Sequence, residues 1–456
     1  MRDDHRRLAQ WLVQCRLGVL ACGLIALAGA GASAAPPADT TGQSAAQDAR
    51  MIVVAIPDKP DLAIAAGATP RGYSGLPDYS GSARSQAAAK RLAMDYSLRE
   101  VSAWTIDALH VRCMLYELPA DVDRDAALEQ LRADKRVDLA QALQEFQTYA
   151  TPSPATAVVP ATSVDPAGYN DPYVGLQQGF SSIDAAAAQR WASGARIEVA
   201  VIDTGVDAAH PDLAGRVASQ RDFVTTPTEA PERDRHGTEV AGVIAAVANN
   251  GVGIVGIAPG TRLRSFRACW PVAAGSSAAR CNTFTLAQAI GAAISSGARV
   301  MNLSLGGPSD PLLEQLVAKA IERGIIVIGA VPPDSGTTGF PIDVDGVIAV
   351  RSSDAPASLR PSLAAPGRDI LTLEPGGHYD YASGSSLATA HVTGTVALLL
   401  ELDPRLAPAS LFALLSDSSR GEDSSIDACA AIRTLTRKGV ACNEVIASRG
   451  LRHAGH

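Results

Sequence analysis

The sequence is poor in lysine and has no concentrated charge of either sign. Five lysines stand among 39 basic residues, and the formal net charge of the 456-residue chain is only −8. A nucleic-acid-binding protein normally has a basic stripe or patch, so no nucleic-acid partner is expected. No run of like charges predicts an acidic or basic tail. The preference for arginine over lysine is a weak indication of a GC-rich bacterial source.

Long apolar runs are missing after the first 35 residues, so no later membrane span is expected. The start is different: four arginines are interspersed up to position 16, and LGVLACGLIALAGAGASAA follows. That stretch ends in Ala32-Ser33-Ala34, a pattern typical of signal-peptidase cleavage. We predict an export signal over 1–35 and a periplasmic or secreted bacterial protein. Two alternatives stay open: a lipoprotein box at 19–22, or an uncleaved signal, the one case in which the membrane is a partner.

Cysteines are few, and their spacing matches no zinc or redox motif. Cys269 and Cys281 flank a Gly/Ser/Ala loop, and Cys429 and Cys442 flank a short C-terminal segment. In an oxidising compartment such pairs predict local disulfides. Unrelated buried thiols are the alternative. Beyond the signal, Cys113 is left as the odd cysteine.

Composition divides the rest of the chain into two folded units, as the length suggests. Residues 36–50 and 151–168 are rich in Ala, Pro and Thr and predict linkers, the first of them disordered. Between them, 51–150 predicts the order β-α-β-β-α-β, typical of a small ferredoxin-like α+β domain. The expected elements are strands at 51–56, 98–106, 110–117 and 136–147 and helices at 84–97 and 123–134.

The larger unit, 169–418, alternates apolar strand runs with helical runs and contains no internal repeat. This alternation predicts an α/β fold with a central parallel sheet. Residues 419–456 remain as a C-terminal extension, which we expect to pack back through a disulfide of its cysteine pair.

Three polar residues of the larger unit stand where catalytic groups gather. Asp203 ends the buried strand IEVAVID, His236 opens a helix, and Ser386 precedes a long apolar helix. A helix N-terminus favours developing negative charge. A serine hydroxyl becomes a good nucleophile when an imidazole takes its proton, and a buried carboxylate orients that imidazole. Singly, each residue could be a turn or cap; together they predict acyl transfer.

The surrounding motifs, in the order Asp, His, Ser, resemble the subtilisin-like serine peptidases (subtilases, peptidase family S8). The matching segments are VIDTGVD at 201–207, HGTEVAG at 236–242 and SGSSLATAHV at 383–392. The resemblance covers about 170–418 and implies a three-layer fold with a central parallel sheet. It also implies that MNLSLGG, at 301–307, lines the substrate cleft, and the expected substrate-binding residues are Ser304, Leu305, Gly306 and Gly307.

The resemblance further implies that 51–150 is a pro-domain. Such a domain assists folding and inhibits the enzyme until the chain is cut, here within 148–168; an unrelated binding module is the alternative. The expected protein is therefore an exported, monomeric serine endopeptidase that acts on polypeptides and is made as a zymogen.

One departure from the family pattern concerns the oxyanion hole. The family places an asparagine after the strand that is here 324–330, but this chain continues VPPDSG. The position falls on Pro333, which has neither a side-chain donor nor an N–H. In subtilisin itself, loss of this donor lowers kcat by about 10²–10³-fold. The backbone N–H of Ser386 would remain, and the candidate replacements are Asp334, Ser335, Thr337 and Thr338.

The missing asparagine makes a weak or inactive pseudo-peptidase that binds peptides the main alternative; a structural protein with a relic triad is another. Other exchanges in the serine motif, at Ser385, Leu387 and Ala390, are small.

Calcium is a further hypothesis from the resemblance. Asp212 and Asn250 match positions that often share a calcium ion in subtilases, and carbonyls of Val252 and Ile254 could complete an oxygen shell. The alternative is that both residues only stabilise turns.

Overall fold

The computed structural model of the protein describes residues 49–58, 82–153, 168–224, 234–333, 338–356, 360–419, 424–437 and 442. The predicted export signal (1–35), most of the linker at 36–50 and all but the ends of the linker at 151–168 lie outside these residues.

The small unit has the predicted β-α-β-β-α-β order. Its sheet is antiparallel, in the order β2-β3-β1-β4. Alternate residues of β1 face opposite sides: Ile52 and Val54 pack against the two helices, and Val53 faces the large unit. The elements are β1 (Met51–Pro57), α2 (Ala83–Asp95), β2 (Arg99–Ile106), β3 (Val111–Glu117), α3 (Arg124–Ala133) and β4 (Leu139–Ala142).

The last strand predicted for this unit, 136–147, is wrong as one element. It is divided into β4, which stays in the small sheet, and β5 (Glu145–Thr148), which joins strands of the large unit. The chain changes partners at Gln144, whose N–H donates to Thr283 Oγ1 at 3.0 Å. The reason is that the free strand edges of β5 find their hydrogen bonds in the large unit.

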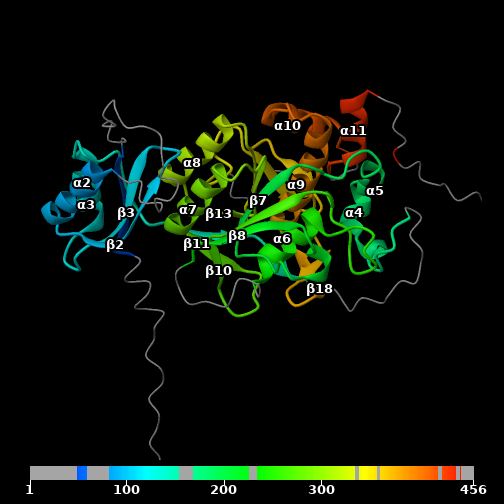
Figure 1. The fold of residues 1–456 in the computed structure, drawn as a ribbon, viewed down its shortest axis with the longest axis horizontal. Coiled ribbons are helices and arrows are strands. Elements are labelled where there is room, and N and C mark those ends of the chain that lie inside the picture. Colours follow the sequence, from blue (N-terminus) through cyan, green and yellow to red (C-terminus); the bar gives the residue numbers. More distant parts are fainter. Residues whose placement is uncertain are drawn as a thin grey trace, which may run out of the picture. The chain divides into compact units, whose positions relative to one another are not determined.

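The large unit is built on a seven-stranded parallel sheet in the order β16-β15-β14-β12-β7-β9-β8. Strands β7 and β8 of this sheet are labelled in Figure 1. The strands are β7 (Glu198–Asp203), β8 (Val217–Asp222), β9 (Arg262–Arg267), β12 (Val300–Leu303), β14 (Ile326–Ala330), β15 (Ile348–Ser352) and β16 (Leu363–Ala365). The larger helices are α6 (Arg235–Ala245), α7 (Thr283–Ile294), α8 (Pro311–Glu322), α9 (Ser385–Leu402), α10 (Pro408–Asp417) and α11 (Ala428–Thr436).

Both faces of this sheet are buried, which explains the continuous apolar runs of its strands. In β7, Val199 and Val201 belong to a core shared with α6 and α9. Ala200 and Ile202 belong to a second core shared with α7 and α8. The predicted three-layer α/β arrangement is therefore confirmed.

Helix α9 corrects the expectation that no segment after residue 35 is apolar enough to span a membrane. With a mean hydropathy of 1.2 over 18 residues, it is the one described helix long and apolar enough to cross a membrane. However, 89% of it is buried inside the protein, as expected for the central helix of a folded core.

The C-terminal part packs back onto the large unit. Cys429 and Ile432 of α11 belong to the same core as α9, so the folded unit continues beyond residue 418. The predicted disulfides Cys269–Cys281 and Cys429–Cys442 are both formed, and Cys113 is a buried free thiol.

Two small sheets complete the large unit beside the ends of the parallel strands. One has the order β10-β11-β5-β13 and the other β17-β18-β6. Their strands are β10 (Cys269–Pro271), β11 (Ala279–Asn282), β13 (Leu305–Gly306), β6 (Thr151–Pro152), β17 (Ile370–Glu374) and β18 (His378–Ser383). Both sheets contain strands from the chain that leaves the small unit.

Candidate active site

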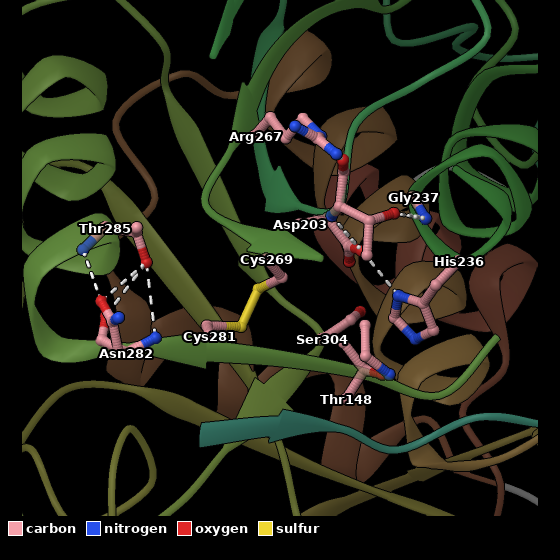
Figure 2. The surroundings of a disulfide bond; sticks show 12 residues. Thr148, Asp203, His236, Gly237, Arg267, Cys269, Cys281, Asn282, Thr285 and Ser304 are labelled. Atoms are coloured by element: carbon pink, nitrogen blue, oxygen red, sulfur yellow. Dashed lines mark hydrogen bonds and ion pairs between the residues drawn. A yellow bond between two sulfur atoms is a disulfide. The ribbon is translucent and has the colours of Figure 1, made fainter. Parts of the chain in front are cut away.

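Asp203 and His236 form a buried pair (Figure 2). Asp203 ends β7 and His236 lies in the first turn of α6, and neither side chain is measurably exposed. Asp203 Oδ1 lies 2.6 Å from His236 Nδ1 and also accepts from Thr204 N at 2.7 Å. With Nδ1–H donating to the carboxylate, the lone pair of the imidazole is on Nε2. Nε2 is thus the atom that can accept a proton.

The electrostatic environment favours the protonated form of His236. Burial alone would lower the pKa of the imidazole, but the adjacent Asp203 carboxylate outweighs burial and raises it. The pair therefore stabilises the imidazolium that a general base becomes after it accepts a proton.

Ser386 lies in the first turn of α9, beside the strand that the motif analysis assigned to the cleft. Its Oγ donates to Ser304 O at 2.9 Å and accepts from Tyr149 N at 3.1 Å. Ser304 Oγ in turn donates to Ser386 O at 3.1 Å. Among the described residues, His236 Nε2 has no hydrogen-bond partner. The serine hydroxyl thus points at a backbone carbonyl and is not bonded to the imidazole.

Segment 145–152 runs as an extended chain between strands, one of which (β13) was predicted to line the substrate cleft. Strand β5 pairs antiparallel with β13, Thr148 opposite Leu305 and Gln147 opposite Gly306. Its other edge pairs antiparallel with β11, Gln147 opposite Arg280. After Tyr149 the same chain continues into β6, which pairs antiparallel with β18. This double-edged pairing is how a peptide adds a strand to a cleft.

Side chains of this segment pack against the predicted cleft residues. Phe146 contacts Gly307 and packs edge-on to Phe340, with ring centroids 5.6 Å apart. A Cβ at Gly306 would lie 2.7 Å from Tyr149 Oη, so only glycine leaves room for the tyrosine. Ser304 and 305–307, expected to bind substrate, all meet the segment or Ser386 here.

The carbonyl of Tyr149 lies at the N-terminus of α9. Ser386 N donates to Tyr149 O at 3.4 Å. Gly384 has φ +153°, and a Cβ there would collide with the same oxygen. Of the candidate replacements for the missing asparagine, Thr338 is exposed and Asp334, Ser335 and Thr337 lie outside the described residues; Pro333 itself is exposed.

Two ion-pair networks around His236 were not predicted from the sequence. Asp234 Oδ2 accepts from Arg267 Nε at 2.6 Å, and the same Nε donates to Thr204 O at 2.8 Å. Arg235 Nε donates to Glu239 Oε1 at 2.7 Å. The first network ties the aspartate loop to α6. The sequence signal that could have indicated these networks is the group of charged residues around the histidine in DRHGTEVAG, at 234–242.

Asp212 and Asn250 come together, but as a hydrogen-bonded pair. Asn250 Nδ2 donates to Asp212 Oδ1 at 2.7 Å, and Ile254 N donates to Asp212 Oδ2 at 2.8 Å. Val252 N donates to Asn250 Oδ1 at 3.0 Å, which fixes the amide with its nitrogen toward the carboxylate. Burial raises the pKa of Asp212 to about 6. Asn250 thus turns a donor nitrogen, not an oxygen, toward Asp212, so the two side chains do not converge as the oxygen ligands that calcium needs.

A sequence model of the subtilase family (Peptidase_S8) matches residues 194–439, over half of the chain. The protein belongs to this family, as its motifs had indicated. It is similar to a thermophilic serine proteinase of Bacillus sp. strain AK1, at 40% identity over 212 residues, 44% of this chain and 51% of that protein. It is similar to thermitase of Thermoactinomyces vulgaris, at 36% identity over 50% of this chain and 84% of thermitase. The chain thus spans about half the length of the first relative.

Solved structures agree on the fold. The crystal structure of fervidolysin from Fervidobacterium pennivorans, a keratinolytic enzyme related to subtilisin, superposes with a TM-score of 0.63 at 22% identity. The likeness covers 86% of this chain and 61% of fervidolysin, so it extends beyond the segment matched by the family model.

The raised pKa of His236 predicts the acid limb of the pH profile. The imidazole must be neutral to accept a proton, so kcat/KM for a peptide should fall as the pH drops through a value above the ordinary 6.5. Asp203→Asn should move this limb to lower pH and decrease kcat by about 10⁴-fold. An acid limb at or below 6.5, or one that Asp203→Asn leaves in place, would contradict the pairing.

The geometry of Asp212 and Asn250 predicts that calcium bound at this pair does not contribute to the stability of the protein. In the Ser386→Ala background, excess chelator should leave the melting temperature unchanged, because an ion that binds only the folded state would raise it. A decrease that added calcium restores, and that is lost when Asp212→Asn is added, would show that the loop at 249–254 rearranges around an ion.

Proposed function

We propose that the protein is an exported serine endopeptidase, made as a zymogen that cuts its own chain between Tyr149 and Ala150. One observation carries the proposal: the segment on both sides of this bond is paired with cleft strands, and the Tyr149 carbonyl faces the backbone N–H of Ser386. The bond thus lies where a substrate's scissile bond would lie.

Ser386 and His236 carry out the bond changes, and Asp203 holds the imidazole in the required tautomer and orientation. Ser386 Oγ, after turning from Ser304 O toward His236 Nε2, attacks the carbonyl carbon of Tyr149 and gives its proton to the imidazole. The Ser386 N–H and the N-terminus of α9 stabilise the negative charge on the carbonyl oxygen. His236 then passes the proton to the amine of Ala150, which leaves. Water, activated by the same imidazole, releases Tyr149 as a carboxylate.

The small unit, 51–150, acts in this proposal as the pro-domain and intramolecular inhibitor. Its sheet packs on α7 and α8: Trp104 lies edge-on to Phe284 with ring centroids 4.8 Å apart. Gln141 Oε1 accepts from Leu312 N at 3.2 Å, at the start of α8. After the cut, β5 would keep its two strand partners. The small unit would therefore block the cleft until it dissociates or is degraded.

A catalytically weak or inactive peptide-binding protein is the second candidate. Pro333 in place of the oxyanion-hole asparagine supports it, and so does the absence of a hydrogen-bond partner on His236 Nε2 among the described residues. Such a protein would hold segment 145–152 without cutting it.

Intact mass of purified protein distinguishes the two candidates. Wild type, expressed without 1–35, should give a fragment that ends at Tyr149 and a second that begins at Ala150, because its triad acts on the bound segment. Ser386→Ala should keep its full-length mass.

Ser418→Ala is a matched control. It removes another buried hydroxyl, one with no partner in the described structure and outside the cleft, so it should be cut like wild type. Full-length masses for all three proteins would contradict the endopeptidase and favour the peptide-binding candidate. A cut at another bond would contradict the assignment of Tyr149–Ala150 alone.

A further inference from the structure

The side chain of Thr148, one residue before Tyr149, is held by a pair of backbone groups. Its Oγ1 donates to Ser277 O at 3.2 Å and accepts from Ala279 N at 3.0 Å. Thr148 is 7% exposed, and Ser277 and Ala279 are 0% and 1% exposed. The hydroxyl therefore uses both its donor and its acceptor in a site that is shielded from water.

The backbone groups that bind this hydroxyl are fixed from two directions. Ser277 Oγ donates to Glu239 Oε1 at 2.7 Å, and Glu239 also accepts from Arg235 at 2.7 Å. Glu239 stands three residues after His236 on α6, so the catalytic helix itself positions the loop. On the other side, the disulfide Cys269–Cys281 joins β10 to β11, the strand that begins at Ala279 (Figure 2).

We propose that this loop is a hydroxyl-reading subsite, so that the enzyme selects polypeptides with threonine or serine at the second residue before the scissile bond. The inference rests on the proposed function, since it takes segment 145–149 as a substrate in place. Valine has the shape of threonine but no hydroxyl. In its place, Ser277 O and Ala279 N would both lose their partner in a buried site.

The other contacts of segment 145–149 discriminate less between one amino acid and another. Strand pairing with β11 and β13 uses backbone groups that every residue except proline provides. The ion pair of Glu145 with Arg280 spans 4.0 Å between side chains that are more than half exposed, and such pairs contribute little. A buried site with a donor and an acceptor at fixed positions, by contrast, rejects a partner that lacks the complementary group.

A pair of chromogenic peptides tests the selection on the self-processed wild-type protein. Phe-Gln-Thr-Tyr and Phe-Gln-Val-Tyr, each followed by p-nitroaniline, differ only in the hydroxyl. We expect kcat/KM to be about 10- to 100-fold higher for the threonine peptide, the effect of two buried hydrogen bonds lost together. A serine peptide should stay within a few-fold of threonine. Equal values for threonine and valine would overturn the proposal.

A second measurement does not depend on catalysis. In full-length Ser386→Ala, the amides of 145–148 should exchange with deuterium about 10- to 100-fold faster when Thr148→Val is added, and nearly unchanged with Thr148→Ser. The same exchange rate in both variants would overturn the hydroxyl subsite even if the protein cuts peptides. Faster exchange in Thr148→Val alone, in a protein that never cuts, would support the subsite while the proposed endopeptidase fails.

Discussion

The antiparallel pairing of β5 between β11 and β13 is the contact on which the rest of the site depends. A single strand has little stability of its own in water, because its backbone groups already form hydrogen bonds with the solvent. Here both edges of β5 are paired, and Phe146 and Tyr149 pack closely against Gly307 and Gly306. The pairing fixes which residue faces Ser386, because a shift by one residue would turn every side chain to the opposite face.

The cleft is assembled from elements that are far apart in the chain and are tied together by polar contacts. Arg267 connects the loop after Asp203 with the start of α6, and Glu239 connects α6 with the hairpin that follows Cys269. The imidazole is therefore held by the same helix that shapes the binding wall. A change in the wall can consequently alter the position of His236 as well as the fit of a substrate.

Much of the fold could be predicted from the sequence, because the patterns that indicate it lie within short stretches of the chain. The alternating strands and helices gave the parallel sheet, and the cysteine spacing gave both disulfides. The partner of β5 could not be predicted, because Glu145 and Phe146 look like any strand residues and their partners lie more than 130 positions away. Asp212 and Asn250 carry the right atoms for calcium, but the N–H of Val252, invisible in a sequence pattern, turns the amide nitrogen toward the carboxylate.

The most direct test of the account is a crosslink that reports the register of β5 against β11. Gln147 and Arg280 stand opposite each other in the β5–β11 pair, a geometry that a disulfide can span. In full-length Ser386→Ala, the double variant Gln147→Cys/Arg280→Cys should form this crosslink spontaneously, as peptide mapping by mass spectrometry would detect. Under the same conditions, Glu145→Cys with Arg280→Cys should stay largely unlinked. Absence of the 147–280 crosslink, or equal crosslinking at both positions, would contradict a segment held in the cleft in this register.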